Sequence, residues 1–225
     1  MVECWATAVE RVVFATLKRD KRVVSVTSPQ PRSGVSALCE QLARSTSLSG
    51  MRTLLLDTTG CAEESVPLSV WQPGMGNAGQ SILRDPAGFD RLRARFTRED
   101  RFKFNNVAHL RQAFAEDLSA YEAVIVDTLP VPANDVSHIN GAAVAAACDG
   151  ALLLCMDGLV SRSALAAAHE ALANTQVTLL GVVLNEMHNP TVGMEIAREA
   201  GKLRRYMPGL ATWLERKARS SVILN

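Results

Sequence analysis

The fold is decided by the stretch VVSVTSPQPRSGVSAL, which occupies residues 23–38. It starts with a short apolar run, turns through a proline-containing loop and enters a segment with helical apolar spacing at Val35, Leu38, Cys39 and Leu42. A strand, a tight loop with glycine and a helix start together present inward-pointing N–H groups and the positive end of a helix dipole. The stretch therefore predicts an anion-binding loop formed by Arg32, Ser33, Gly34 and Ser36.

The loop lacks one residue that a complete phosphate-binding loop has. Such a loop carries a lysine that reaches the phosphates, followed by a serine or threonine that holds magnesium. Here Ser36 is present, but Val35 occupies the place of the lysine. By itself this signal is weak, because strand–loop–helix turns of this shape also occur for purely structural reasons.

Four more apolar runs follow along the chain, at 53–56, 123–126, 151–155 and 179–184. Each is four to six residues long and nearly all apolar, which is typical of strands covered on both faces. Helical spacing appears between them, from Val35 towards Gly50, over Leu110–Leu118 and over Ser163–Ala173. This alternation predicts an α/β protein with a doubly wound, mainly parallel sheet flanked by helices.

The stretch from Thr59 to Asn106 is rich in glycine and proline and is the least regular part of the chain. We expect a long excursion there, with one helix around Phe89–Phe96. The 225 residues are predicted to form a single domain, with an N-terminal helix over 1–20 and a basic C-terminal helical tail over 190–225. That tail suits a membrane surface or an acidic partner, although a solvated helix face is the commoner case.

Polar side chains end three of the predicted strands. Asp57 and Asp127 end the second and third apolar runs, and Asn185 ends the last. Ligands of open α/β sheets bind at the carboxyl ends of the strands. Ser36, Asp57 and Asp127 are therefore candidate ligands for Mg²⁺, and the Asn185 amide is a candidate for reading a base edge. The alternative is that each of these groups only caps its strand.

Composition limits the remaining possibilities. The net charge of +1 gives no bulk attraction to nucleic acid, so no nucleic-acid partner is expected. Five cysteines without a C-x-x-C pair favour core positions and a reducing cytoplasm. The longest apolar stretch, 141–156, is too short and too interrupted to cross a bilayer, so any membrane recruitment would depend on a partner.

In order and spacing, these motifs resemble the cytoplasmic domain of bacterial tyrosine kinases (BY-kinases), within the MinD/ParA-like P-loop superfamily. That family carries the loop T-S-P-x-P-G-E-G-K-S-T, where this chain has TSPQPRSGVSA at 27–37. The family's D-x-D-x-R motif corresponds to LLLDTTGC at 54–61, and its D-T-P-P-V motif to VIVDTLPV at 124–131. The resemblance covers roughly residues 3–186 and implies a P-loop NTPase fold of the MinD/BY-kinase type.

The departures from the family pattern bear on activity. The lysine is replaced by Val35, the second acid of D-x-D by Thr59 and the following arginine by Cys61. The family's N-terminal E-x-x-R-x-x-R appears as ECWATAV at 3–9, and the tail 216–225 has no tyrosine. Asp57 and Asp127 are then vestigial catalytic residues, and neither enzymatic activity nor tyrosine autophosphorylation is expected.

The resemblance implies a nucleotide cleft that is either empty or weakly filled by ATP or ADP with Mg²⁺. It also implies an accessory or regulatory role beside a membrane polysaccharide co-polymerase in bacterial capsule or exopolysaccharide production. The alternative is a weak Mg²⁺-ATPase of the MinD/ParA type, with Arg32 in place of the lysine, that switches by forming a homodimer. A third possibility is a positioning module that acts on a membrane surface.

Overall fold

The computed structural model describes residues 21–60, 63, 70–132 and 137–185. The predicted helix over 1–20 and the tail over 190–225 lie outside these residues. The elements are β1 (Val23–Thr27), α2 (Val35–Leu48), β2 (Thr53–Asp57), α3 (Ala78–Ser81), β3 (Leu83–Arg84), β4 (Asp90–Arg93), α4 (Arg101–Asn105), α5 (Val107–Glu116), β5 (Ala123–Asp127), α6 (Gly141–Ala147), β6 (Gly150–Met156), α7 (Arg162–Ala173) and β7 (Leu179–Asn185).

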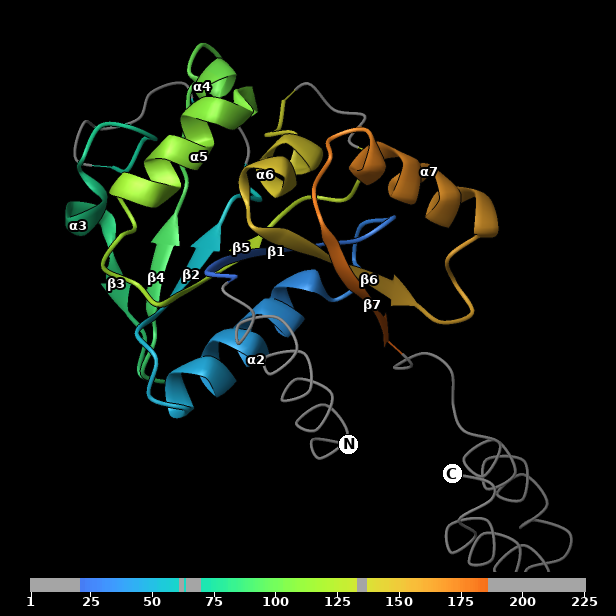
Figure 1. The fold of residues 1–225 in the computed structure, drawn as a ribbon, viewed down its shortest axis with the longest axis horizontal. Coiled ribbons are helices and arrows are strands. Elements are labelled where there is room, and N and C mark those ends of the chain that lie inside the picture. The colour runs from blue at the N-terminus through green and yellow to red at the C-terminus, as the bar shows by residue number, and fades with distance from the viewer. Residues whose placement is uncertain (1–20, 61–62, 64–69, 133–136, 186–225) are drawn as a thin grey trace, which may run out of the picture. The chain divides into compact units, whose positions relative to one another are not determined.

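The described strands form one sheet in the order β3-β4-β2-β5-β1-β6-β7 (Figure 1). β4, β2, β5, β1 and β6 pair in parallel, and β3 adds an antiparallel edge. All five predicted strands are present, and the α/β class with a mainly parallel sheet is confirmed. Because the strands run in parallel, their carboxyl ends meet at one edge of the sheet.

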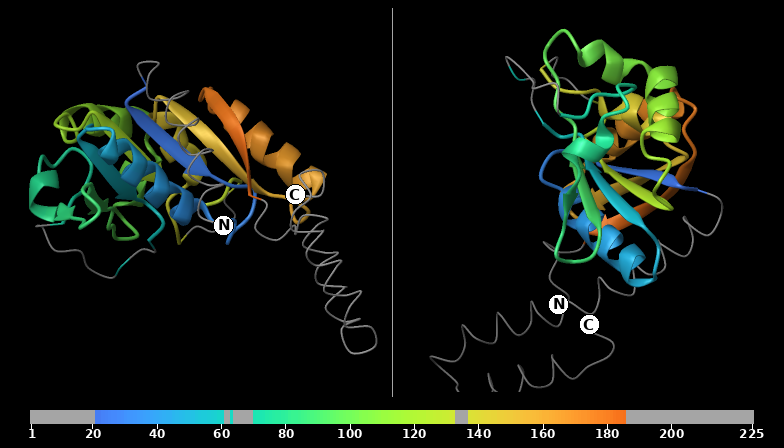
Figure 2. Two further views of the ribbon diagram at one scale, coloured as in Figure 1. Left: turned by 90° about the horizontal axis from the view of Figure 1, so that it is seen from below. Right: turned by 90° about the vertical axis from the view of Figure 1, so that its left-hand side faces the viewer.

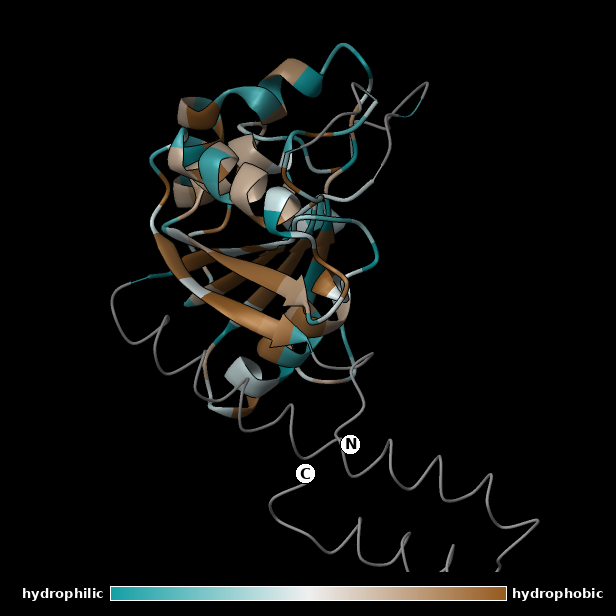
Figure 3. Ribbon diagram, turned by 90° about the vertical axis from the view of Figure 1, so that its right-hand side faces the viewer, coloured by the Kyte–Doolittle hydropathy of each residue, from teal (hydrophilic) through white to brown (hydrophobic). Residues whose placement is uncertain are grey.

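Helices cover both faces of the sheet. α2 packs on β5, β2 and β1 from one side, whereas α4, α5, α6 and α7 lie on the opposite side (Figures 1 and 2). β1, β2, β5 and β6, which lie between these layers, are mostly apolar, and the hydropathy colouring shows apolar strands in brown (Figure 3). This explains why they appear in the sequence as continuous apolar runs and do not alternate between apolar and polar residues.

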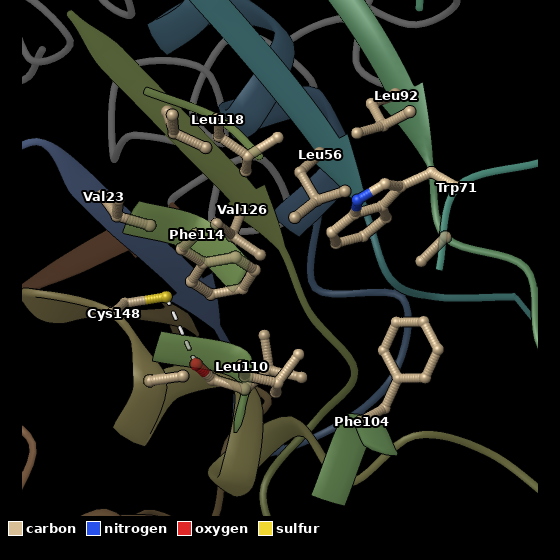
Figure 4. Packing of buried hydrophobic residues seen from close by; sticks show 14 of the residues in the cluster. Val23, Leu56, Trp71, Leu92, Phe104, Leu110, Phe114, Leu118, Val126 and Cys148 are labelled. Carbon is tan, nitrogen blue, oxygen red and sulfur yellow. Dashed lines mark hydrogen bonds between the residues drawn. The ribbon is translucent and has the colours of Figure 1, made fainter. Parts of the chain in front are cut away.

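The core alternates along each strand with a period of two. Val24, Leu55 and Ile125 pack towards α2. Their neighbours in sequence pack towards α5 and α6 on the other face, in a cluster that contains Leu56, Val126, Trp71, Phe104, Leu110 and Phe114 (Figure 4). Trp71 is fully buried, and its indole N–H donates to the Asp117 carboxylate at 2.9 Å. The irregular segment therefore also contributes to the core.

The helix expected around Phe89–Phe96 is wrong, because these residues include β4. Leu92, Ala94 and Phe96 are buried, whereas the arginines between them face outward. A turn closed by the Gly88 N–H bonding to the Asp85 carbonyl reverses the chain before the strand. Buried apolar residues at every second position are typical of a strand. The arginines between them made this pattern hard to recognise in the sequence.

Of the described residues, those up to Cys155 together with Val160–Val183 form one compact unit, and Met156–Leu159 belongs to a second unit with the residues from Leu184. The prediction of a single domain over 1–225 stays a prediction. Among the described helices, none combines the length and apolar character that crossing a bilayer requires.

Candidate functional site

The loop between β1 and α2 has the backbone geometry of an anion-binding turn. Arg32 and Gly34 both have positive φ, at 61° and 92°. The hydroxyls of Ser28 and Ser33 donate to the Gln30 carbonyl at 2.7 and 2.8 Å and hold the turn closed. Left-handed residues set among right-handed ones turn successive N–H groups towards one concavity. The loop keeps this shape although an arginine stands where the BY-kinase pattern has glycine, at a cost of about 1 kcal/mol.

α2 begins at Val35, directly after the loop, with Gly34 as its N-cap. The Val35 side chain is buried and belongs to the apolar cluster between α2 and the sheet. Ser36 and Ala37 are exposed in the first turn of the helix. The helix N-terminus can therefore still offer its N–H groups to an anion, but residue 35 adds packing where a lysine would add charge.

Asp127 ends β5 and is 6% exposed. Its backbone carbonyl accepts the N–H and the hydroxyl of Thr58, at 3.0 and 2.7 Å. Its carboxylate is hydrogen-bonded to Ser36, and its Oδ1 is buried without a hydrogen-bond partner in the described part of the chain. Burial, reinforced by the charges of Asp57 and Glu40, raises the pKa of Asp127 to about 6, although the Ser36 bond opposes the shift.

Asp57 lies opposite Asp127 in the pairing of β2 with β5, but its carboxylate is already engaged. Oδ1 accepts the N–H and the hydroxyl of Thr59, at 2.9 and 2.7 Å. Oδ2 accepts from Arg93 Nε at 3.0 Å, and β4 holds Arg93 in register with Asp57. Asp57 is thus the partner of a cation from the neighbouring strand.

A pocket of about 390 Å³ opens beside the loop, within the size range of small-molecule sites. Its lining includes the predicted residues Arg32, Ser33, Gly34, Ser36 and Asp127, together with Ser28, Val35, Thr59 and Thr128. Asp57 is not part of the lining and reaches the pocket only through Thr59. The structure thus brings together most of the predicted set from three separate segments of the chain.

Asn185 is the last residue of β7 and is 2% exposed. Its backbone carbonyl accepts the N–H of Asp157 at 3.0 Å. Both residues belong to the second compact unit, whereas the loop belongs to the first. The base-reading role of Asn185 stays a prediction.

The residues at the pocket fit Mg²⁺ in part. A hydroxyl on Ser36 next to a buried carboxylate oxygen without a partner is the oxygen donor set that this ion takes, with waters and phosphates completing its shell. Asp57 fits less well, because both of its oxygens already accept hydrogen bonds. Of the three predicted ligands, Ser36 and Asp127 are the two that remain available.

Arg93 is the residue that sequence reasoning missed. It brings a positive charge to the edge of the sheet that carries Asp57, yet no P-loop motif contains it. A signal was available in RLRARF at 91–96, where arginines alternate with apolar residues, because this alternation predicts a strand. Its pairing with Asp57 could be found only from the order of the strands.

Scans of the sequence against protein-family models and against curated proteins gave no match. Comparison with solved structures did give matches. The BceF tyrosine kinase domain is similar with a TM-score of 0.61 and 23% identity, covering 82% of this chain and 76% of that chain. The kinase domain of Escherichia coli tyrosine kinase ETK has a TM-score of 0.64 and 22% identity, covering 79% and 75%.

The MinC:MinD cell division protein complex of Aquifex aeolicus also contains a similar chain, with a TM-score of 0.52 and 13% identity, covering 73% of this chain and 68% of that chain. At these identities the likeness concerns the fold. The chain therefore has the fold of the BY-kinase domains and of the MinD-like P-loop ATPases.

Proposed function

We propose that this chain is a catalytically degenerate BY-kinase-like protein, which binds nucleotide weakly and does not transfer phosphate. The observation that carries the proposal is the buried Val35 in the position of the phosphate-binding lysine. The pairing of Asp57 with Arg93 supports it, because a carboxylate that already accepts from Thr59 and from a guanidinium is a poorer base and a poorer metal ligand.

The size of the interaction that the missing lysine would make predicts weak nucleotide binding and a still larger loss of catalytic rate. A charge-assisted hydrogen bond contributes about 1.5–3 kcal/mol, so the missing lysine lowers nucleotide affinity by roughly ten- to a hundredfold. Phosphoryl transfer depends on positive charge where negative charge develops in the transition state. Among the described residues that line the pocket, Arg32 is the only cation, and it is exposed at the rim.

The biological role that we propose follows from the resemblance to BY-kinases. The chain would act as an accessory or regulatory protein in bacterial capsule or exopolysaccharide production, in the cytoplasm. Its partner would be a membrane polysaccharide co-polymerase that recruits it to the inner membrane. The fold likeness to the BceF and ETK kinase domains supports the family resemblance on which this role rests.

A weak Mg²⁺-ATPase of the MinD/ParA type that switches by forming a homodimer is the second candidate. Two observations favour it: the loop backbone keeps its anion-binding shape, and Ser36 remains bonded to Asp127. In that case Arg32 would supply the charge that Val35 lacks.

Incubation of the purified full chain with radiolabelled ATP and Mg²⁺ tests the first proposal. We expect no phosphotyrosine and no phosphate release above a Ser36→Ala control, because the charge that stabilises the transition state is missing. Release that Ser36→Ala abolishes would support the ATPase instead. Robust phosphotyrosine on Tyr121 or Tyr206 would refute a degenerate site.

The biological role needs a separate test. Deleting the gene in its host should lower the yield of extracellular polysaccharide, and complementation with either the natural chain or the Ser36→Ala variant should restore it. An unchanged yield after deletion would remove the polysaccharide role and leave the assignment of the site untouched.

A further inference from the structure

A second pocket opens at the edge of the sheet where the parallel strands begin, opposite the edge that carries the loop. It measures about 250 Å³ and is formed by the end of α2, the residues that lead into β2 and the turn between β3 and β4. Gly50 and Gly88 line it with positive φ and without side chains. The chemistry of this amino-edge pocket is decided by the side chains of Ser47, Arg52, Arg84, Asp90 and Tyr121.

The lining residues of the amino-edge pocket lie outside the motifs that resemble the BY-kinase pattern. Both edges of the sheet belong to the same compact unit, so the pocket and the loop are features of one body. The proposed function assigns no role to the amino-edge pocket.

Three of these side chains carry hydrogen-bond donors that no group in the described ranges accepts. The Arg52 guanidinium and the Ser47 hydroxyl have no hydrogen-bond partner there. Arg84 makes only an ion pair, because its Nε lies 3.7 Å from Asp90 Oδ1, which is too far for a hydrogen bond. Both arginines are exposed, so they can turn towards a ligand without breaking a hydrogen bond within these ranges.

Asp90 is the acid among the lining residues, and it is already engaged. Its side chain is 17% exposed, its Oδ2 accepts the Tyr121 hydroxyl at 2.8 Å, and its Oδ1 is buried beside Arg84. Burial and the bond to Asp90 raise the pKa of Tyr121, so this hydroxyl keeps its proton and continues to donate to the acid. Arg52 and Arg84 oppose the rise, because both charges lie close enough to act on the Tyr121 hydroxyl.

The balance of charge in the amino-edge pocket favours an anion. Two arginines and one aspartate give the lining a net charge of +1. The carbonyl end of α2 opposes an anion here, but this dipole effect is smaller than one charge-assisted hydrogen bond, and two guanidinium groups are available. The donors come from α2, from the residue before β2 and from β3. Donors from three directions suit a tetrahedral phosphate, and the guanidinium fork matches its oxygens.

We propose that the amino-edge pocket binds a phosphate group, held by Arg52, Arg84 and Ser47, either as inorganic phosphate or as a small phosphate monoester. The pocket is smaller than the roughly 300–1,000 Å³ of drug-sized ligand sites, so its ligand is smaller than a nucleotide. This inference does not depend on the proposed function, because no residue of the loop takes part in it.

An NMR titration of the ¹⁵N-labelled full chain with inorganic phosphate, at constant ionic strength, tests this inference. We expect the amide signals of Gly50, Arg52 and Gly88 to shift until the site is saturated. Unchanged signals at these three residues would overturn the proposal. The amides of Ser33 and Gly34 report separately on the loop, so binding at one site is distinguished from binding at the other.

Parallel titrations with glycerol 3-phosphate and with acetate identify the ligand class. Tighter binding of glycerol 3-phosphate than of inorganic phosphate would support the proposal and assign the pocket to a monoester. Equal or weaker binding of glycerol 3-phosphate would also support it and assign the pocket to inorganic phosphate. Acetate that bound as tightly as phosphate would refute a site built for a phosphate group.

The double variant Arg52→Ala with Arg84→Ala should weaken phosphate binding at least about tenfold, the factor that one charge-assisted hydrogen bond contributes. Both side chains are exposed, so the fold should be retained. Arg98→Ala, in an exposed arginine outside the pocket, is the matched control and should keep the natural affinity. Equal losses in the double variant and in Arg98→Ala would mean general charge attraction and would overturn the proposal.

Discussion

Asp127 is a buried carboxylate whose surroundings disfavour its charged form. Its pKa is raised to about 6, chiefly by burial at the end of β5. The folded protein therefore holds a proton that the unfolded chain has released, between about pH 4 and about pH 6. Stability falls as the pH rises through this window and levels off above it, because the charged form is the costly one.

We predict that Asp127→Asn removes most of this pH dependence. A pKa rise of about two units corresponds to about 3 kcal/mol of lost stability at neutral pH. The measurement is urea unfolding of both proteins in metal-free buffer. As the pH rises from about 4 to about 7, the free energy of unfolding of the natural chain should fall relative to that of Asp127→Asn. Parallel pH profiles would mean that Asp127 titrates normally in the folded state.

Arg32, in the loop, and Val35, at the start of α2, both depart from the BY-kinase pattern, but with different consequences. Arg32 keeps the left-handed backbone conformation that glycine would adopt without strain. Val35 keeps the helix start and loses the charge. The shape of the loop thus depends on its backbone and on the Gln30 carbonyl, whereas its chemistry depends on single side chains.

At the scale of elements, β4 turns an irregular segment into part of the sheet. It places Leu92 in the core at 1% exposure and leaves Arg93 outside. β4 pairs with β2 in parallel, so Arg93 reaches the same edge of the sheet as Asp57. The excursion between β2 and α5 therefore contributes both packing and a charge near the site.

Substitutions at two adjacent residues of β4 should lower the free energy of unfolding by very different amounts. Leu92→Ala should lower the free energy of unfolding by about 2–5 kcal/mol, because it leaves a cavity beside Leu56 and Trp71. Arg93→Ala should cost no more than about 1 kcal/mol, since the Arg93 side chain is 65% exposed and its charge is well solvated. Chemical denaturation measures both; equal costs would contradict a strand with one buried face.

At the scale of the whole molecule, long-range polar contacts tie the start of the sheet together. The Arg22 guanidinium donates to the carbonyls of Phe114 and Leu118, at 2.8 and 2.7 Å. The Asp149 carboxylate accepts the N–H of Arg22 and of Val23, at 2.9 and 2.8 Å. One residue ahead of β1 thus joins the end of α5 to the turn before β6.

Arg22→Ala should lower the free energy of unfolding by about 1.5–3 kcal/mol, the range for hydrogen bonds made by charged groups. It leaves carbonyls at the end of α5 without their donor. Arg52→Ala, in an exposed residue at the same end of the sheet, is the matched control and should change stability little. A cost for Arg22→Ala as small as that of Arg52→Ala would show that water replaces the guanidinium.

Much of the fold could be predicted, because a strand covered on both faces must be apolar throughout. This recovered β1, β2, β5 and β6, and helical spacing recovered α2, α5 and α7. β7 was also found as an apolar run, although its Val182 and Leu184 are exposed. It failed for β4, whose arginines alternate with core residues. It also left α6 unassigned, since an Ala-rich stretch of seven residues runs on into the apolar residues of β6.

By itself, the sequence determined the phosphate-loop turn, the absence of its lysine and the acids at the strand ends. These are local features: each depends on residue types within one short stretch. Only the tertiary structure decided that Asp57 is engaged by Arg93, that Val35 is buried and that the pocket hydroxyls donate inward. These facts depend on which strands become neighbours, and residues as far apart as 57 and 93 meet only once the sheet has formed.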